Sequence, residues 1–276
     1  MKYRLVLLSF LISTLVLSAQ DYSWRAIKID GEITGCTTPS LDNIEESIGT
    51  FTKPCGKYIS PSGKKFKRNS STAKVAKVVL DVQPKMARVK KVIAYSPEYM
   101  GKDYPESALT NWFVDILMDG VEKASGKQVD VGVANFGGVR IDMPQGDVIL
   151  DDMLSMFPFK NQIVYLELSG SSLRKMVEDM AASKFQILGG LRVLVEDGQV
   201  ISCTIGNIPL EDDKYYGVAT ISFLLAGGDD LRLADGARNI EIYDIDIIDV
   251  VLDFVYAETR AGRPLTSEVD DRLIIR

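Results

Sequence analysis

Two kinds of apolar spacing follow one another along residues 72–276, and their order is what most constrains the fold. Apolar side chains recur at helical spacing over 109–121, whereas 163–168 and 215–220 are short apolar runs typical of buried strands. Helices and strands do not alternate strictly, as they would in a parallel sheet built from βαβ units. The sequence therefore predicts an α+β fold, with a mixed α/β arrangement of its elements.

Turn and capping residues mark the ends of the expected elements. The helix over 109–121 should end at Ser125-Gly126, because glycine commonly terminates helices. Asp151 and Ser171 are the expected N-caps of two further helices, and Glu196–Gln199 has the length of a hairpin turn. Further strands are expected over 92–95, 129–134, 191–195, 200–205, 240–243 and 273–275. Two further helices are expected, one over 75–89 and one that follows the strand over 240–243 and ends at about residue 258.

The first twenty residues have the pattern of a secretory signal peptide. Lys2 and Arg4 precede an apolar run over 5–17 that is short for a transmembrane helix, and small residues follow it. A membrane anchor is the alternative interpretation of this run. We expect the mature chain to be exported to the periplasm or the extracellular space, and to contact no membrane once the signal is removed.

Residues 21–71 are expected to form an extension and not a compact domain. They contain a short alternating segment over 24–29 and a hairpin over 57–66 that turns at Pro61-Ser62-Gly63. The remainder is Gly, Ser, Thr and Lys, which offers too little apolar surface to fold alone.

Residues 53–91 are strongly basic, with twelve lysines and arginines and one acid, Asp81. Such a concentration of charge can mark an acidic partner, a membrane surface or nucleic acid. Aromatic side chains are not interleaved as in single-strand binders, so we expect no nucleic-acid partner. The other interpretation is a basic face that lies against the acidic body of the same protein.

The chain contains no histidine. This excludes Ser-His-Asp and Cys-His triads, and the dinuclear phosphoesterase centres that mix imidazole with carboxylate ligands. A carboxylate-only magnesium or calcium site stays open, but the acidic residues have no recognisable spacing for one, so we expect no cofactor in this chain. Among the three cysteines, Cys36 and Cys55 could form a disulfide in an exported protein, while Cys203 lies in a strand pattern typical of a buried thiol.

Three loops set glycine or proline beside polar or aromatic residues at the end of an element, where binding groups commonly lie. The first runs from Asn135 to Arg140 and contains Gly137-Gly138. Adjacent glycines let a backbone approach a ligand closely, Arg140 offers a planar fork for oxygen atoms, and Asn135 can donate and accept hydrogen bonds. A tight turn without a ligand is the commoner explanation of such a glycine pair.

The second loop is Phe157–Asn161. An aromatic ring held beside proline could support a flat ligand, and Asn161 could contact the edge of that ligand. The residues alone favour the alternative, two core phenylalanines at the end of a helix.

The third loop, Phe223–Asp229, has an aromatic residue at its start, Gly227-Gly228 at its centre and a carboxylate at its end. A ring stacked on Phe223, with Asp229 accepting hydrogen bonds from ribose hydroxyls, is chemically sensible. An ordinary glycine-rich hairpin loop is equally sensible, and the P-loop pattern is absent.

In order and spacing, these stretches resemble the C-terminal, substrate-binding domain of the 5′-nucleotidase family over residues 72–276. The resemblance implies a sandwich of sheets and helices, without the metallophosphatase half that performs hydrolysis. Five pieces carry it: Pro105-Glu106-Ser107 with Asn111, Asn-x-Gly-Gly-x-Arg at 135–140, Pro-Phe-x-Asn at 158–161, Gly189-Gly190, and Phe-Leu-x-Ala-Gly-Gly-Asp at 223–229.

The resemblance also implies a substrate site. The base of a nucleotide would lie between Phe159 and Phe223, Asp229 would hold the ribose, and Asn161 would reach the base edge. The polar residues of the first loop would orient the substrate. The implied substrate-binding residues are Asn135, Arg140, Phe159, Asn161, Phe223, Gly227, Gly228 and Asp229, and no catalytic residue or metal ligand is implied in this chain.

Two residues depart from the family pattern. Asp103 stands where the family commonly places a substrate-binding arginine, and a carboxylate there would repel phosphate. Ala226 precedes the glycine pair of the third loop, where the family often has asparagine.

Three functions are compatible with these observations. The chain could be the nucleotide-recognition subunit of a split 5′-nucleotidase in nucleotide catabolism, inactive alone and completed by a separate metallophosphatase chain that holds the divalent metals. It could be an exported nucleoside-binding protein without a catalytic partner. It could also be a scaffold that has kept the fold and lost the site.

Overall fold

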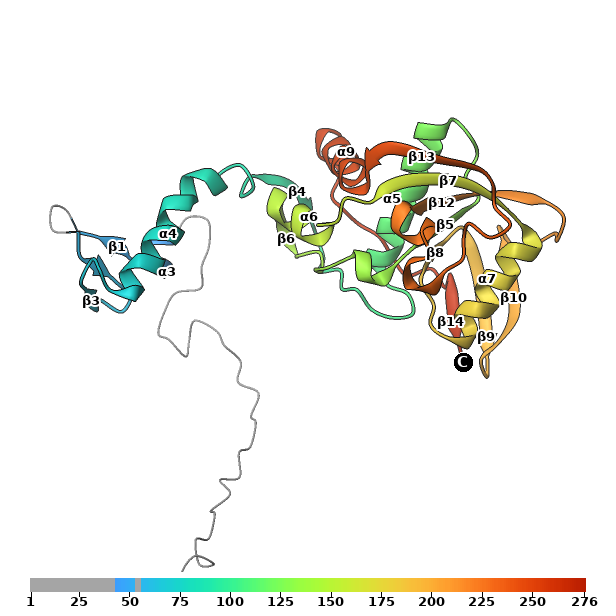
Figure 1. Ribbon diagram of the computed structural model, residues 1–276, viewed down its shortest axis with the longest axis horizontal. Coiled ribbons are helices and arrows are strands. Elements are labelled where there is room, and N and C mark those ends of the chain that lie inside the picture. Colours follow the sequence, from blue (N-terminus) through green and yellow to red (C-terminus); the bar gives the residue numbers. More distant parts are fainter. Residues whose placement is uncertain (1–42, 53–55) are drawn as a thin grey trace, which may run out of the picture. The chain divides into compact units, whose positions relative to one another are not determined.

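The computed structural model describes residues 43–52 and 56–276, which separate into two units on either side of the Val82–Gln83 bond (Figure 1). Each unit has an apolar core of its own. The division falls within the helix Ser71–Met86, whereas the sequence predicted a domain boundary between residues 71 and 72. The expected signal peptide, the alternating segment over 24–29, Cys36 and Cys55 lie outside the described residues.

The smaller unit is a three-stranded antiparallel sheet with helices before and after it. The hairpin expected over 57–66 is confirmed, and its turn is closed by the Gly63 amide, which donates to the Ser60 carbonyl at 2.8 Å. Tyr58 is buried at its centre, so these residues have a small core that the sequence did not suggest. The elements are α3 (Ile44–Ile48), β1 (Thr50–Phe51), β2 (Tyr58–Ile59), β3 (Lys65–Phe66) and α4 (Ser71–Met86).

Helix α4 does not pack through the valines whose helical spacing predicted it. The side chains that are buried are instead Ala73 and Ala76, which lie in the cluster around Tyr58. Two of the valines, Val75 and Val78, are 65% and 64% exposed. Small alanines allow a helix to approach a sheet closely, which explains the choice of face.

The larger unit is built on a five-stranded sheet in the order β13-β7-β12-β5-β8. Neighbouring strands are antiparallel, except β12 and β5, which run parallel. The sheet contains the strands expected over 129–134, 163–168, 215–220 and 240–243. Its strands are β5 (Val131–Ala134), β7 (Gln162–Ser169), β8 (Ile187–Gly189), β12 (Tyr215–Ile221) and β13 (Arg238–Asp246).

Helix α5 (Ala108–Ser125) packs against this sheet, and its predicted apolar face is buried. Two glycines let it approach the strands. Gly132 of β5 and Gly189 of β8 are register partners, and a Cβ atom on either would lie 2.7 Å from an atom of Met118. The helix ends as predicted, with Gly126 in the left-handed conformation at φ +66°.

A second sheet, in the order β11-β10-β9-β14, carries the predicted hairpin over 191–205 and the predicted C-terminal strand. A two-stranded sheet joins β4 and β6, and the α+β fold is as predicted. The further elements are β4 (Val92–Ser96), β6 (Gly146–Ile149), α6 (Leu150–Met156), α7 (Gly170–Ala182), β9 (Leu191–Glu196), β10 (Gln199–Ile205), β11 (Ile208–Pro209), α8 (Ser222–Leu225), α9 (Ile247–Arg260) and β14 (Leu273–Ile275).

Each of the two predicted N-caps lies two residues after the observed one. The N-cap of α6 is Ile149 and not Asp151, and the side chain of Asp152 in the first turn accepts the Ile149 amide at 2.8 Å. Ser169, and not Ser171, accepts the Ser172 amide at 3.1 Å at the start of α7. In each case the helix begins earlier than the apolar pattern indicated.

Candidate functional site

The three predicted loops meet at one end of the five-stranded sheet. β7 and β12 are antiparallel, and Ile163 near the start of β7 pairs with Ile221 at the end of β12. β5 runs parallel to β12, so its last residue, Ala134, lies at the same end. The first loop follows β5, the second precedes β7 and the third follows β12. The sheet topology therefore gathers segments that are about 90 residues apart in the sequence.

One direct bond joins the second and third loops. The Gln162 amide, next to Asn161, donates to the Ser222 hydroxyl, next to Phe223, at 3.1 Å. The Asn161 carbonyl in turn accepts the amide of Ile247, the first residue of α9, at 2.9 Å. The loops that carry Phe159 and Phe223 are thus fixed to one another and to the helix behind them.

Asn135 is the buried polar residue of the first loop. It is 6% exposed, and its carboxamide oxygen has no hydrogen-bond partner among the described residues. A Cβ atom on Gly138 would lie 2.7 Å from this oxygen, so the glycine pair makes room for the amide. A buried acceptor without a partner costs on the order of 1–3 kcal/mol, and a ligand donor that reached it would remove that cost.

Lys102 braces the same loop, a feature that the sequence did not reveal. Its ammonium group donates to the Phe136 carbonyl at 3.1 Å and to the Val139 carbonyl at 2.5 Å. Its own amide donates to Asp142 at 2.9 Å. No motif marked Lys102, because a lysine that binds main-chain carbonyls leaves no spacing pattern in the sequence.

Arg140 and Phe159 lie against each other between the first two loops. The guanidinium carbon is 5.7 Å from the centre of the Phe159 ring, a cation–π geometry, and Nη1 donates to the Gly137 carbonyl at 3.3 Å. The Arg140 amide donates to the carbonyl of Met156, at the end of α6, at 2.9 Å. Arg140 therefore has polar contacts within the protein and still reaches the surface.

The two phenylalanines of the second loop have different environments. Phe157 is 3% exposed and packs against Phe113, with ring centres 4.7 Å apart. Phe159 is 46% exposed. The expectation of two core phenylalanines is right for Phe157 and wrong for Phe159, whose ring is available to a ligand.

Phe223 presents a second exposed ring. It lies in the single-turn helix α8, is 41% exposed, and rests on Gly228, where a Cβ atom would lie 2.5 Å from Cζ of the ring. Gly227 has φ +87°, and the exposed Asp229 is left-handed at φ +52°. The glycine pair thus has a packing role, since Gly228 provides the space that the Phe223 ring occupies.

Negative charge lies beside the first loop. Asp103, the departure from the family pattern, is exposed, and one of its carboxylate oxygens would be 3.3 Å from a Cβ atom on Gly101. The Tyr99 hydroxyl donates to Asp142, and this hydrogen bond, with the nearby carboxylates, raises the pKa of Tyr99. Two carboxylates next to Lys102 give this side of the loop little attraction for a phosphate group.

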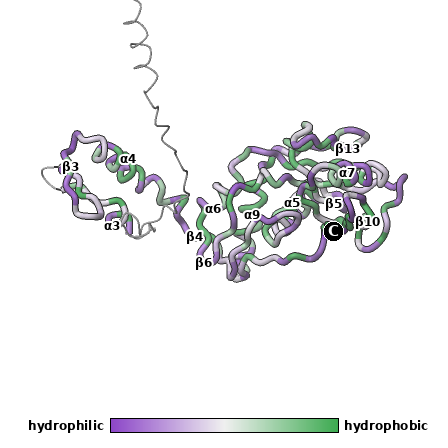
Figure 2. The backbone as a smooth tube through the Cα atoms, turned by 90° about the horizontal axis from the view of Figure 1, so that it is seen from below, coloured by the Kyte–Doolittle hydropathy of each residue, from purple (hydrophilic) through white to green (hydrophobic). Residues whose placement is uncertain are grey.

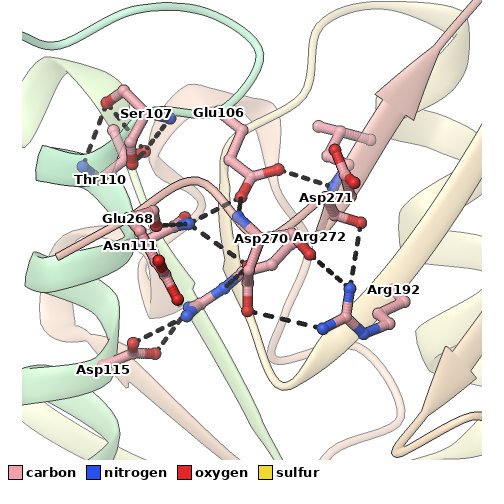
Figure 3. Close-up of polar contacts among 11 residues, drawn as sticks. Glu106, Ser107, Thr110, Asn111, Asp115, Arg192, Glu268, Asp270, Asp271 and Arg272 are labelled. Carbon is pink, nitrogen blue, oxygen red and sulfur yellow. Dashed lines mark hydrogen bonds and ion pairs between the residues drawn. The ribbon is translucent and has the colours of Figure 1, made fainter.

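The Pro105–Asn111 piece of the family pattern fastens the C-terminal segment and does not join the three loops (Figure 3). Glu106 accepts the Asn111 side-chain amide at 2.7 Å and the main-chain amides of Asp270 and Leu273 at 3.0 and 3.2 Å. Arg272 binds Asp270 at 2.7 Å and forms a bidentate pair with Asp115 at 2.6 and 2.8 Å. These contacts hold the segment that leads into β14.

The described residues contain no group of three His, Cys, Asp or Glu side chains arranged to hold a metal ion. The residues of this chain, which include no histidine, do not fit the dinuclear centre of a phosphoesterase. Over residues 43–52 and 56–276, no helix is long and apolar enough to cross a membrane.

A family model described as "5′-nucleotidase, C-terminal domain" matches residues 85–235. A "5′-nucleotidase-related protein" of Glossina morsitans morsitans is 28% identical over 166 residues, covering 52% of this chain and 29% of that protein. The "5′-nucleotidase" of Vibrio cholerae is 33% identical over 110 residues, covering 37% of this chain and 19% of that protein. The chain thus spans less than a third of the length of these relatives.

The solved structures agree on the fold. The crystal structure of a 5′-nucleotidase precursor from Thermus thermophilus superimposes with a TM-score of 0.64 at 19% identity, covering 74% of this chain and 43% of that one. The NAD nucleotidase of Haemophilus influenzae gives 0.51 at 17% identity, covering 80% and 48%. At these identities the likeness is one of fold.

Proposed function

Because the chain belongs to the 5′-nucleotidase C-terminal domain family, we propose that it is the nucleoside- or nucleotide-recognition subunit of a split 5′-nucleotidase. Hydrolysis would require a separate metallophosphatase chain. The observation that carries the proposal is the pair of half-exposed rings, Phe159 and Phe223, on loops tied together by the Gln162–Ser222 hydrogen bond. Aromatic faces at one edge of a sheet are suited to a flat base.

Each polar residue has a task in this proposal. The base stacks between the two rings and Asn161 contacts its edge. Asp229, on the exposed loop after Phe223, accepts hydrogen bonds from the ribose hydroxyls. Asn135 supplies the unpaired acceptor of the first loop, and Arg140 supplies a cation near the ligand. The metal ions and the attacking water belong to the partner chain, so the residues named here bind and orient the substrate.

The partner requirement can be tested by phosphate release from AMP. This chain, a metallophosphatase chain from the same organism, and the mixture of the two are assayed at equal concentrations. The proposal predicts that the mixture is faster than the sum of its parts, and that Phe223→Ala lowers kcat/KM of the mixture by roughly tenfold or more, since base–aromatic stacking is worth on the order of 1–3 kcal/mol. A mixture with no added activity would contradict the split enzyme.

One observation favours a second function, an exported nucleoside-binding protein with no catalytic partner. Asp103 and Asp142 place carboxylates beside the first loop. A nucleoside lacks the phosphate that these charges would repel. Equal or tighter binding of adenosine than of AMP, with no gain in phosphate release from any partner, supports this second function. The pattern of the first twenty residues supports export in both cases.

A further inference from the structure

A cavity lies between helix α7 and the segment 230–235, which continues from the third loop towards β13. Its volume is about 370 Å³, near the lower end of the range of ligand pockets, which starts at about 300 Å³. The segment returns to α7 at Gly236, where a Cβ atom would lie 3.3 Å from the Ser172 hydroxyl oxygen. The cavity therefore has room for a small molecule.

This cavity is separate from the candidate nucleoside site. None of the residues proposed to bind the nucleoside lines it. Leu168, which does line it, is five residues along β7 from Ile163, at the end of the sheet where the three loops meet. Five residues of a strand extend over about 17 Å. The two places come closest in the sequence at Asp230, which lines the cavity and follows Asp229 of the third loop.

The floor of the cavity is apolar. Leu168 and Leu233 are each 2% exposed, and Met176 and Leu231 are each 8% exposed. Met176 is one of the buried residues of α7, a helix along which hydrophobic and hydrophilic residues alternate (Figure 2). An apolar group of a ligand would find a preformed surface here.

Charged side chains form the rim. Lys175 and Asp179 of α7 pair with each other at 3.1 Å. The other three, Asp230, Arg232 and Asp235, are exposed and belong to the segment. Among the described residues, none forms an ion pair or a side-chain hydrogen bond with any of these three. One cation and two carboxylates are thus available to a ligand.

The charges indicate the class of that ligand. The planar fork of Arg232 suits a carboxylate, and the carboxylates of Asp230 and Asp235 suit an ammonium group. With two cations and three carboxylates in its lining, the cavity has a net negative charge, which disfavours a nucleotide or another multiply charged anion. A molecule with a carboxylate, an ammonium group and an apolar side chain complements both the rim and the floor.

We propose that this cavity binds an α-amino acid with an apolar side chain. The carboxylate of the amino acid pairs with Arg232, its ammonium group pairs with Asp230 and Asp235, and its side chain lies on Leu168 and Leu233. The inference does not rest on the proposed function, because no residue of the nucleoside site takes part.

Calorimetric titration of the mature protein with L-leucine tests the proposal. Two analogues are titrated beside it: 4-methylpentanoate, which lacks the ammonium group, and 3-methylbutylamine, which lacks the carboxylate. We expect L-leucine to bind, and each analogue to bind at least tenfold more weakly, since each loses one charge-assisted contact. No binding of L-leucine at millimolar concentration, or an analogue that binds equally well, would overturn the proposal.

Substitutions then locate the bound leucine. Arg232→Met removes the charge and should weaken L-leucine binding by roughly tenfold or more, whereas Arg232→Lys should keep part of it. Arg260→Met is the matched control, because Arg260 is also exposed and has no ion pair with a described residue. Thermal unfolding confirms that the variants are folded. Wild-type affinity for L-leucine in Arg232→Met would overturn the proposal.

Phe223→Ala separates this inference from the proposed function. We expect this variant to bind L-leucine as the wild type does, and Arg232→Met to bind adenosine as the wild type does. Loss of L-leucine binding in Phe223→Ala would place the amino acid in the nucleoside site and overturn the inference. A wild-type chain that binds L-leucine and no adenosine would refute the proposed function alone.

Discussion

The attachment of the C-terminal segment depends most on the carboxylate of Glu106. Removing this carboxylate should lower the free energy of unfolding. It accepts three hydrogen bonds, from the Asn111 side chain and from the main-chain amides of Asp270 and Leu273. In Glu106→Ala the two amides lose this acceptor, while Asn111 keeps its bond to the Glu268 carbonyl at 2.9 Å.

The size of the effect follows from these contacts. Hydrogen bonds to a charged group contribute about 1.5–3 kcal/mol each when well buried, and Glu106 is only half-buried. At about 1 kcal/mol each, the three bonds give a loss of roughly 3 kcal/mol. For a unit of this size that lowers Tm by about 6–12 °C.

The assay is thermal unfolding followed by circular dichroism, with hydrogen exchange of the C-terminal peptide as a local readout. Glu268→Ala is the matched control, because Glu268 is exposed and only its main-chain carbonyl takes part in the network. Exchange over 268–276 should rise in Glu106→Ala and stay unchanged in the control. A Glu106→Ala protein with wild-type Tm and wild-type exchange would refute this explanation of the Pro105–Asn111 piece.

Three further predictions follow from single contacts. Gly228→Ala should push the Phe223 ring aside by nearly 1 Å, because a Cβ atom would lie 2.5 Å from Cζ of the ring and ordinary contact begins at 3.4 Å. Calorimetry should show that the affinity for adenosine falls about tenfold, with little change in Tm. An unchanged affinity would contradict the packing role of Gly228. Lys102→Met should weaken adenosine binding several-fold, because the Phe136 and Val139 carbonyls lose their shared donor, and Lys102→Arg should restore part of the binding if that donation matters. Burial raises the pKa of Cys203 to about 11, so peptide mapping should find this thiol unmodified by iodoacetamide at pH 8 until the protein is denatured. Rapid labelling of the folded chain would contradict its burial. The contribution of the neutral thiol to the free energy of unfolding is complete below the pKa of the unfolded chain and is lost as the pH rises toward the pKa of the folded chain.

The elements with long periodic patterns were predicted from the sequence, and some of the short ones were not. Helix α5 has an apolar stripe and a glycine stop, and both its face and its end are as expected. Strands β6 and β8 have only three or four residues, too few to establish a period. Helix α4 shows a different limit of the pattern, because its valines Val75 and Val78 are mostly exposed. Periodicity identifies an apolar stripe, and it cannot tell whether the chain itself covers that stripe.

The three loops of the candidate site could be predicted from the sequence, but the contacts that arrange their side chains could not. Glycines and aromatic residues mark the loops in the sequence, and the exposure of Phe159 and Phe223 agrees with the proposed ligand-facing role. The brace from Lys102 and the unpaired oxygen of Asn135 depend on contacts that sequence spacing does not encode. Two residues of the family pattern, Glu106 and Asn111, stabilise the fold, because they bind each other and the C-terminal segment.

The proposed function depends on an aromatic site for a nucleoside formed by Phe159 and Phe223. Calorimetric titration of the mature protein with adenosine, repeated on Phe223→Ala and on Ile208→Ala as an exposed control, tests it most directly. We predict that the wild type binds adenosine, that Phe223→Ala weakens this binding by roughly tenfold or more, and that Ile208→Ala leaves it unchanged. Binding that survives intact in Phe223→Ala, or no binding to the wild type at millimolar adenosine, would contradict it.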